Sequence, residues 1–178
     1  MRNLAFLLFL GAAFTLNSCK KSTSSPSITG TWAISGISGT TTAQATPSAK
    51  QFLTTYAYAS PILTLTDTTS NVLITVTYEN WEFNSDGTYS IKEQYQAANA
   101  SAPTVHSSSG WWDYTGSTLP NSTIVLRNGG STTVVPIGGS LFIKSVTSTQ
   151  LVLTAQDTNT STTGSSSSND FTLTFTRQ

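Results

Sequence analysis

The chain is short of charge, of cysteine and of histidine. Its 178 residues include one cysteine, so no disulfide can form within the chain, and the fold must be stable through its core alone. Charged residues make up 9% of the sequence, against a usual share of about 25%. The 8 basic residues balance the 8 acidic ones, so no strongly basic face is available to meet phosphates, which argues against nucleic acid as a partner.

Patterns typical of catalytic and metal sites are also scarce. The single histidine, His106, lies in a polar stretch with no second metal ligand beside it, and we expect a solvated loop side chain. No Gly-x-Ser-x-Gly elbow accompanies the abundant serines, and a hydroxyl without a base is a weak nucleophile. The sequence therefore predicts neither an enzyme nor a bound cofactor or metal.

Serine and threonine occupy the positions that charged residues usually fill. Threonine favours strands because its branched Cβ fits the pleated sheet, and serine favours turns. Apolar and polar residues alternate from Ile28 to Ser35, which predicts a half-buried first strand. Similar segments recur as far as Phe171–Phe175, so we expect an all-β domain, an antiparallel up-and-down barrel of 8–10 strands.

Three segments interrupt this strand pattern. Ser48 and Gln51 form a capping box, so we expect one short helix over Ser48–Ala59, between the first two strands. Residues 96–109 and 157–170 are long and polar, and we expect them to form loops.

The N-terminus has the features of an export signal. Arg2 precedes an apolar run, residues 4–14, which is too short for a membrane span of about 20 residues. Leu16-Asn17-Ser18-Cys19 resembles the lipobox of Gram-negative lipoproteins, in which the cysteine is acylated and becomes the mature N-terminus. The alternative is an ordinary signal peptide with an incidental cysteine. We expect a signal peptide over 1–18, a lipidated serine-rich tether over 19–27 and one barrel domain over 28–178.

The residues after the cysteine predict where the protein is anchored. Lys20-Lys21 follows Cys19. In the Gram-negative lipoproteins that this N-terminus resembles, an aspartate directly after the cysteine marks retention in the inner membrane, and an acidic cluster marks export to the cell surface. Neither signal is present here. We therefore expect a lipid anchor in the outer membrane, with the domain facing the periplasm; the alternative is a domain on the cell surface.

Several short motifs follow in an order that resembles a known family. Gly30-Thr31-Trp32 opens the first strand, Trp81-x-Phe-Asn-x-Asp-Gly-Thr-Tyr89 forms a hairpin, and Gly110-x-Trp112 comes next. Behind a lipobox, this order resembles the lipocalin-like domain of small Gram-negative lipoproteins, over Ile28 to Arg177. The resemblance implies that Arg177 closes the barrel end over Trp32, and the alternative is a frayed terminus.

Strand parity assigns seven large side chains to the barrel interior: Trp32, Trp81, Phe83, Tyr89, Ile91, Phe171 and Phe175. With the helix across one mouth, they would line a cavity for a small apolar ligand such as a fatty acid. The alternative is a filled barrel that contacts partners or glycans through its loops and through an exposed tryptophan of the Trp111-Trp112 pair, unless the 96–109 loop covers it. The expected ligand-lining residues are Trp32, Phe52, Tyr56, Trp81, Phe83 and Tyr89.

Two glutamates lie near this interior. Pairing of Trp81 with Ile91 in the hairpin would set Glu79 opposite Glu93 on the inner face, where like charges would raise a pKa. Val76 and Trp81 are both expected to face inward, but they are an odd number of positions apart, which a regular strand does not allow. We therefore place a bulge near Glu79-Asn80 that turns Glu79 outward.

The lipid anchor can be tested by removing the thiol. We expect the Cys19→Ala variant to take up no labelled palmitate and to leave the membrane fraction, because the lipid on Cys19 supplies the attachment. Fractionation of cells after metabolic labelling measures both effects. Membrane retention of the unlabelled variant would contradict the lipoprotein interpretation.

Overall fold

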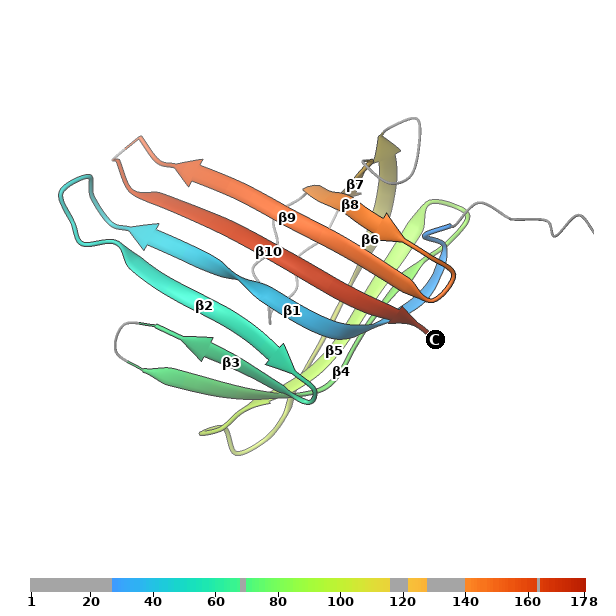
Figure 1. The fold of residues 1–178 in the computed structure, drawn as a ribbon, viewed down its shortest axis with the longest axis horizontal. Helices are drawn as coiled ribbons and strands as arrows, with labels where there is room; N and C mark the ends of the chain where they lie inside the picture. The colour runs from blue at the N-terminus through green and yellow to red at the C-terminus, as the bar shows by residue number, and fades with distance from the viewer. Residues whose placement is uncertain (1–26, 68–69, 116–121, 128–139, 163) are drawn as a thin grey trace, which may run out of the picture.

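The computed structural model describes residues 27–67, 70–115, 122–127, 140–162 and 164–178, which fold into antiparallel strands (Figure 1). Among these residues there is no helix, and hence none that could cross a membrane. The expected all-β barrel of 8–10 strands is confirmed. The strands are β1 (Gly30–Gln44), β2 (Phe52–Ala59), β3 (Ile62–Thr66), β4 (Asn71–Phe83), β5 (Thr88–Ala97), β6 (Thr104–Thr115), β7 (Thr123–Arg127), β8 (Ser140–Val146), β9 (Gln150–Thr160) and β10 (Ser166–Arg177).

The strands close into a ring in the order β1–β10–β9–β8–β7–β6–β5–β4–β3–β2. β1 pairs with β10 along almost its whole length. Its other edge is shared, because residues 30–33 pair with β4 and residues 38–43 pair with β2. The β2–β3 hairpin is therefore inserted into the ring at one end only. Since barrel diameter grows with strand number, the ring is narrower where β1 meets β4.

We name the two ends of the barrel after this difference. The closed end holds the Trp32–Trp81 pair of β1 and β4 and the hairpin between β4 and β5. The open end holds the turn between β1 and β2, residues 45–51, and the turn between β9 and β10, which includes Ser161 and Gly164. In Figure 1 the closed end lies at the right and the open end at the left.

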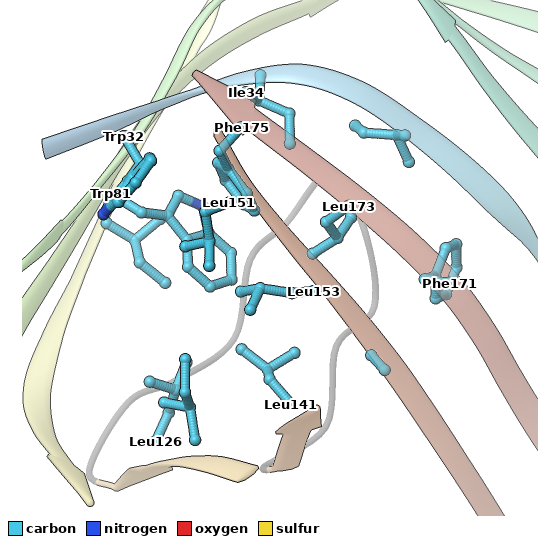
Figure 2. Close-up of a cluster of buried hydrophobic side chains, with 14 of the residues drawn as sticks. Trp32, Ile34, Trp81, Leu126, Leu141, Leu151, Leu153, Phe171, Leu173 and Phe175 are labelled. Carbon is cyan, nitrogen blue, oxygen red and sulfur yellow. The ribbon is translucent and has the colours of Figure 1, made fainter. Parts of the chain in front are cut away.

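Apolar side chains fill the closed end (Figure 2). The ring of Trp81 lies 5.1 Å from that of Phe175 and 6.2 Å from that of Phe83, measured between centroids. Tilted aromatic contacts of this kind stabilise a core beyond the effect of the buried area alone. The predicted inward set is confirmed, since all seven members are buried: Trp32, Trp81, Phe83, Tyr89, Ile91, Phe171 and Phe175.

The hairpin between β4 and β5 follows from its turn chemistry. Phe83 pairs with Tyr89, as the sequence predicts. Gly87 has a φ of +84°, the left-handed conformation that this turn requires. The carboxylate of Asp86 accepts the backbone N–H of Thr88 at 2.9 Å, which holds the turn in place. This turn fixes the register of β4 against β5.

The predicted helix over Ser48–Ala59 is wrong. Residues Phe52–Ala59 form β2, which pairs with β1 on one side and with β3 on the other. The segment contains β-branched Thr54 and Thr55, which favour a strand, and Tyr56 alternates with exposed neighbours, as expected for a strand buried on one face. These tertiary pairings override the local capping pattern.

The two predicted loops are mostly strand as well. β6 begins at Thr104, so only residues 98–103 connect β5 to β6. β9 continues to Thr160 and β10 begins at Ser166, which extends this hairpin well beyond the core. Backbone hydrogen bonds hold these serine- and threonine-rich strands together without apolar side chains. Their polar composition therefore led to the prediction of loops.

The terminal arginine closes the barrel at its narrow end. The guanidinium carbon of Arg177 lies 4.5 Å from the centroid of the Trp32 ring, so the stacking contact implied by the sequence resemblance is present. Its Nη2 donates to the carbonyl oxygen of Ser27 at 2.7 Å, and the Trp32 indole donates to the carbonyl of Ile28 at 2.6 Å. These contacts tie both ends of the domain to the closed end.

Gly39 lets β1 and β10 approach each other where it pairs with Phe171. A Cβ at this position would lie 2.3 Å from the carbonyl oxygen of Asp170 and 2.5 Å from the Phe171 ring. Both distances are far below van der Waals contact, and one of the atoms is backbone. The close approach therefore requires a residue without a side chain.

We expect Gly39→Ala to lower the free energy of unfolding by about 1–3 kcal/mol, because β1 and β10 must separate to admit the methyl group. Urea denaturation measures the loss. Gly36→Ala is the matched control on the same strand, since its Cβ would meet the Thr174 side chain at 3.3 Å and no backbone atom. Equal stability of Gly39→Ala and the parent protein would show that the two strands are not held this closely.

Candidate functional site

Three ionisable side chains form one row across the inner wall of the barrel. Glu79 on β4 pairs with Glu93 on β5, and Glu93 pairs with His106 on β6. Each shares the inward parity of its strand, as Trp81 and Ile91 do two residues away from the two glutamates. The row thus lies beside the apolar core of the closed end.

The two glutamates are buried almost completely. Glu79 is 1% exposed and Glu93 is 0% exposed. The indole N–H of Trp81 donates to Oε1 of Glu79 at 2.9 Å, while Oε2 of Glu79 finds no hydrogen-bond partner among the described residues. Nδ1 of His106 lies 2.8 Å from Oε1 of Glu93. Because Nδ1 itself is buried and the His106 side chain is 34% exposed, the opposite edge of the imidazole meets solvent.

This environment favours a bound proton on Glu79. Burial raises the pKa of Glu79 from its ordinary value of 4.5 to about 7. The N–H of Trp81 lowers this pKa by stabilising the carboxylate, and the nearby charge of Glu93 raises it. Glu79 can therefore bind or release a proton near neutral pH, while Glu93 orients the imidazole of His106.

Two predictions about this row are wrong. The bulge of β4 lies between Val76 and Tyr78, before Glu79, and so leaves Glu79 on the inner face rather than turning it outward. His106 lies on β6 against Glu93 rather than in a solvated loop. The hairpin register that pairs Trp81 with Ile91 was the sequence signal that could have found the row.

The structure separates the six residues that were expected to line a ligand cavity. Trp32, Trp81, Phe83 and Tyr89 pack inside the closed end. Tyr56 is also buried and meets the ring of Phe171 edge-on at 5.0 Å. Phe52, by contrast, is 57% exposed and lies near the open end on β2. Cys19 lies outside the described residues.

The adjacent tryptophans on β6 point to opposite faces, as predicted. Trp112 packs edge-on against Phe83 at 5.6 Å, and its indole donates to the carbonyl of Asn84 at 3.2 Å. Trp111 is 55% exposed and pairs across strands with Arg127, which forms an ion pair with Asp113. Of the two alternatives for this residue, the exposed one holds, and residues 96–109 do not cover it.

Comparison with known proteins gives no relative to guide the assignment. No protein-family model, curated protein or solved structure matches the chain. Within the described ranges, no group of three or more histidine, cysteine, aspartate or glutamate side chains is placed to hold a metal ion. The function has to be argued from the geometry of the barrel itself.

The proton on Glu79 predicts how stability depends on pH. The folded protein keeps this proton up to about pH 7, whereas the unfolded chain loses it near pH 4.5, so stability falls as pH rises through this window and levels off above it. Glu79→Gln retains an oxygen for the Trp81 N–H but cannot ionise. Relative to the parent, its free energy of unfolding should rise by about 3 kcal/mol between pH 4.5 and pH 8.

Urea denaturation of both proteins across this pH range measures the difference. Glu82→Gln is the matched control, because Glu82 lies on the same strand, faces outward and is exposed. Its stability should follow that of the parent at every pH. A constant difference between Glu79→Gln and the parent across the range would show that Glu79 is ionised throughout.

Proposed function

We propose that the protein is a lipid-anchored, lipocalin-like module of the bacterial outer membrane that recognises a ligand or partner through its surface and catalyses no reaction. One observation carries this proposal: the closed end of the barrel is filled. Trp32, Trp81, Phe83 and Phe175 are each 0–1% exposed, so protein atoms cover these rings almost completely. An apolar ligand there would require free ring faces.

The row of Glu79, Glu93 and His106 does not suggest catalysis. Both carboxylates are covered by protein atoms, and a general acid or base must reach within hydrogen-bond distance of its substrate. The row resembles a buried network that is stabilised by its own contacts, with Trp81 and His106 as the two partners. We therefore assign it a role in the barrel wall.

The position of Ser27 fits the anchored arrangement. Ser27 lies at the closed end, where its carbonyl accepts a hydrogen bond from Arg177. A tether over residues 19–27, carrying lipid on Cys19, would therefore leave the barrel at this end. The open end would face away from the membrane, where a ligand or partner in the periplasm can reach it.

The alternative function is the binding of a small apolar ligand inside the barrel. It has one observation in its favour, namely that His106 lies on the inner wall and is still 34% exposed. Solvent thus reaches the interior beside β6, beyond the filled end. A ligand entering there would meet His106 rather than the buried aromatic rings.

A dye-binding experiment separates the two functions. We expect purified Cys19→Ala protein to give no saturable fluorescence increase with an environment-sensitive apolar dye, and to carry no lipid after extraction from cells. Saturable binding that fatty acids displace would overturn the proposal in favour of the apolar ligand. Phe52→Asp would then locate it, because this change alters only the open end and spares the core.

A further inference from the structure

Two turns that are distant in the sequence enclose a groove at the open end. The turn between β1 and β2 and the turn between β9 and β10 lie at the same end of the barrel (Figure 1). The groove between them has a volume of about 360 Å³, within the range of about 300–1,000 Å³ that is usual for small-molecule sites. Its lining includes Ala43, Gln44, Phe52, Asn159, Ser161 and Ser167.

Contacts within and between the turns hold the groove in shape. Nε2 of Gln44 donates to the carbonyl oxygens of Pro47 at 3.1 Å and Ala49 at 2.8 Å. On the other side, the hydroxyls of Ser161 and Ser165 lie 2.6 Å apart. Gly164, with a φ of +82°, packs so tightly that a Cβ there would lie 2.9 Å from the ring of Pro47. The groove is therefore formed before any ligand arrives, which lowers the entropy cost of binding.

The lining exposes more apolar than polar surface, and its polar groups are uncharged, which suits a neutral ligand with both an apolar face and hydroxyl groups. None of the residues that line it carries a charge, and most offer an amide or a hydroxyl group. The exposed ring of Phe52 supplies one aromatic face among these neutral donors and acceptors. A charged ligand would lose hydration here without gaining a counter-charge, and a purely apolar one would leave polar groups unpaired.

We propose that this groove binds a neutral saccharide, with a sugar ring stacked on Phe52 and its hydroxyls hydrogen-bonded to Asn159 and Ser167. This inference rests on the proposed surface recognition and names its ligand. Asp157 lies two residues before Asn159 with the same strand parity, so an anionic saccharide would be repelled. A lipid surface is disfavoured, because a lipid on Cys19 would place the membrane at the end of the barrel where Ser27 lies, opposite the groove.

The test uses the full-length lipoprotein in detergent micelles and isothermal titration calorimetry. The probes are neutral oligosaccharides of glucose, mannose, galactose and xylose, together with oligogalacturonate as the anionic counterpart. Vesicles of phosphatidylethanolamine and phosphatidylglycerol test for a lipid surface. We expect saturable binding of at least one neutral oligosaccharide, and no binding of oligogalacturonate or vesicles.

Variants of Phe52 show whether the ring face makes the contact. Phe52→Ala and Phe52→Leu should each weaken binding about tenfold, because both remove the aromatic face, whereas Phe52→Tyr should retain it. Asn159→Ala should weaken binding about fivefold through the loss of one amide contact. Trp111→Ala is the matched control, since Trp111 is equally exposed but lies on β6, away from the groove. Its affinity should equal that of the parent.

Several outcomes would overturn the saccharide site. They are no binding of any neutral oligosaccharide, binding that Phe52→Leu leaves unchanged, or binding that Trp111→Ala abolishes. Binding of vesicles alone would assign the groove to lipid instead. None of these outcomes contradicts the proposed surface recognition. That proposal is tested separately, and it fails if the protein binds the apolar dye saturably and fatty acids displace the dye.

Discussion

The architecture depends on one strand, β1, which pairs with three others. Its bonds to β10 run from Trp32 to Gln44, and its second edge is divided between β4 and β2. Closure of the ring removes the free edges that would otherwise invite aggregation. Because β2 and β3 enter at one end only, the same division of β1 makes one end narrow enough for side chains to fill and the other wide enough to remain partly open.

The row of Glu79, Glu93 and His106 places two buried carboxyl groups in the wall of the barrel. Burying Glu79 and Glu93 costs free energy, which contacts with Trp81 and His106 partly offset. Protonation of Glu79 reduces that cost further, because a neutral carboxyl is easier to bury than a carboxylate. The row therefore couples the barrel wall to the pH of its surroundings without any need for a bound ligand.

Much of the fold could be predicted from the sequence, because strand alternation and turn chemistry are local signals. The inward aromatic set and the hairpin around Gly87 followed directly from them. The helix over Ser48–Ala59 failed because its capping pattern is also local, whereas the pairing of β2 with β1 and β3 is not. Glu79 and His106 were misplaced for a similar reason, since the position of a bulge and the start of β6 depend on neighbouring strands. The groove had no sequence signal, because it joins turns more than 100 residues apart.

The course of β1 also has a mechanical consequence. The strand begins beside Ser27 at the closed end and finishes at Gln44 on the wall of the groove. Tension between a membrane anchor and a bound ligand would therefore run along the strand axis. The hydrogen bonds to β10 lie across this line of force, so they would resist together in shear instead of opening one after another. With the proposed anchor and ligand in place, the barrel would act as a stiff link under load.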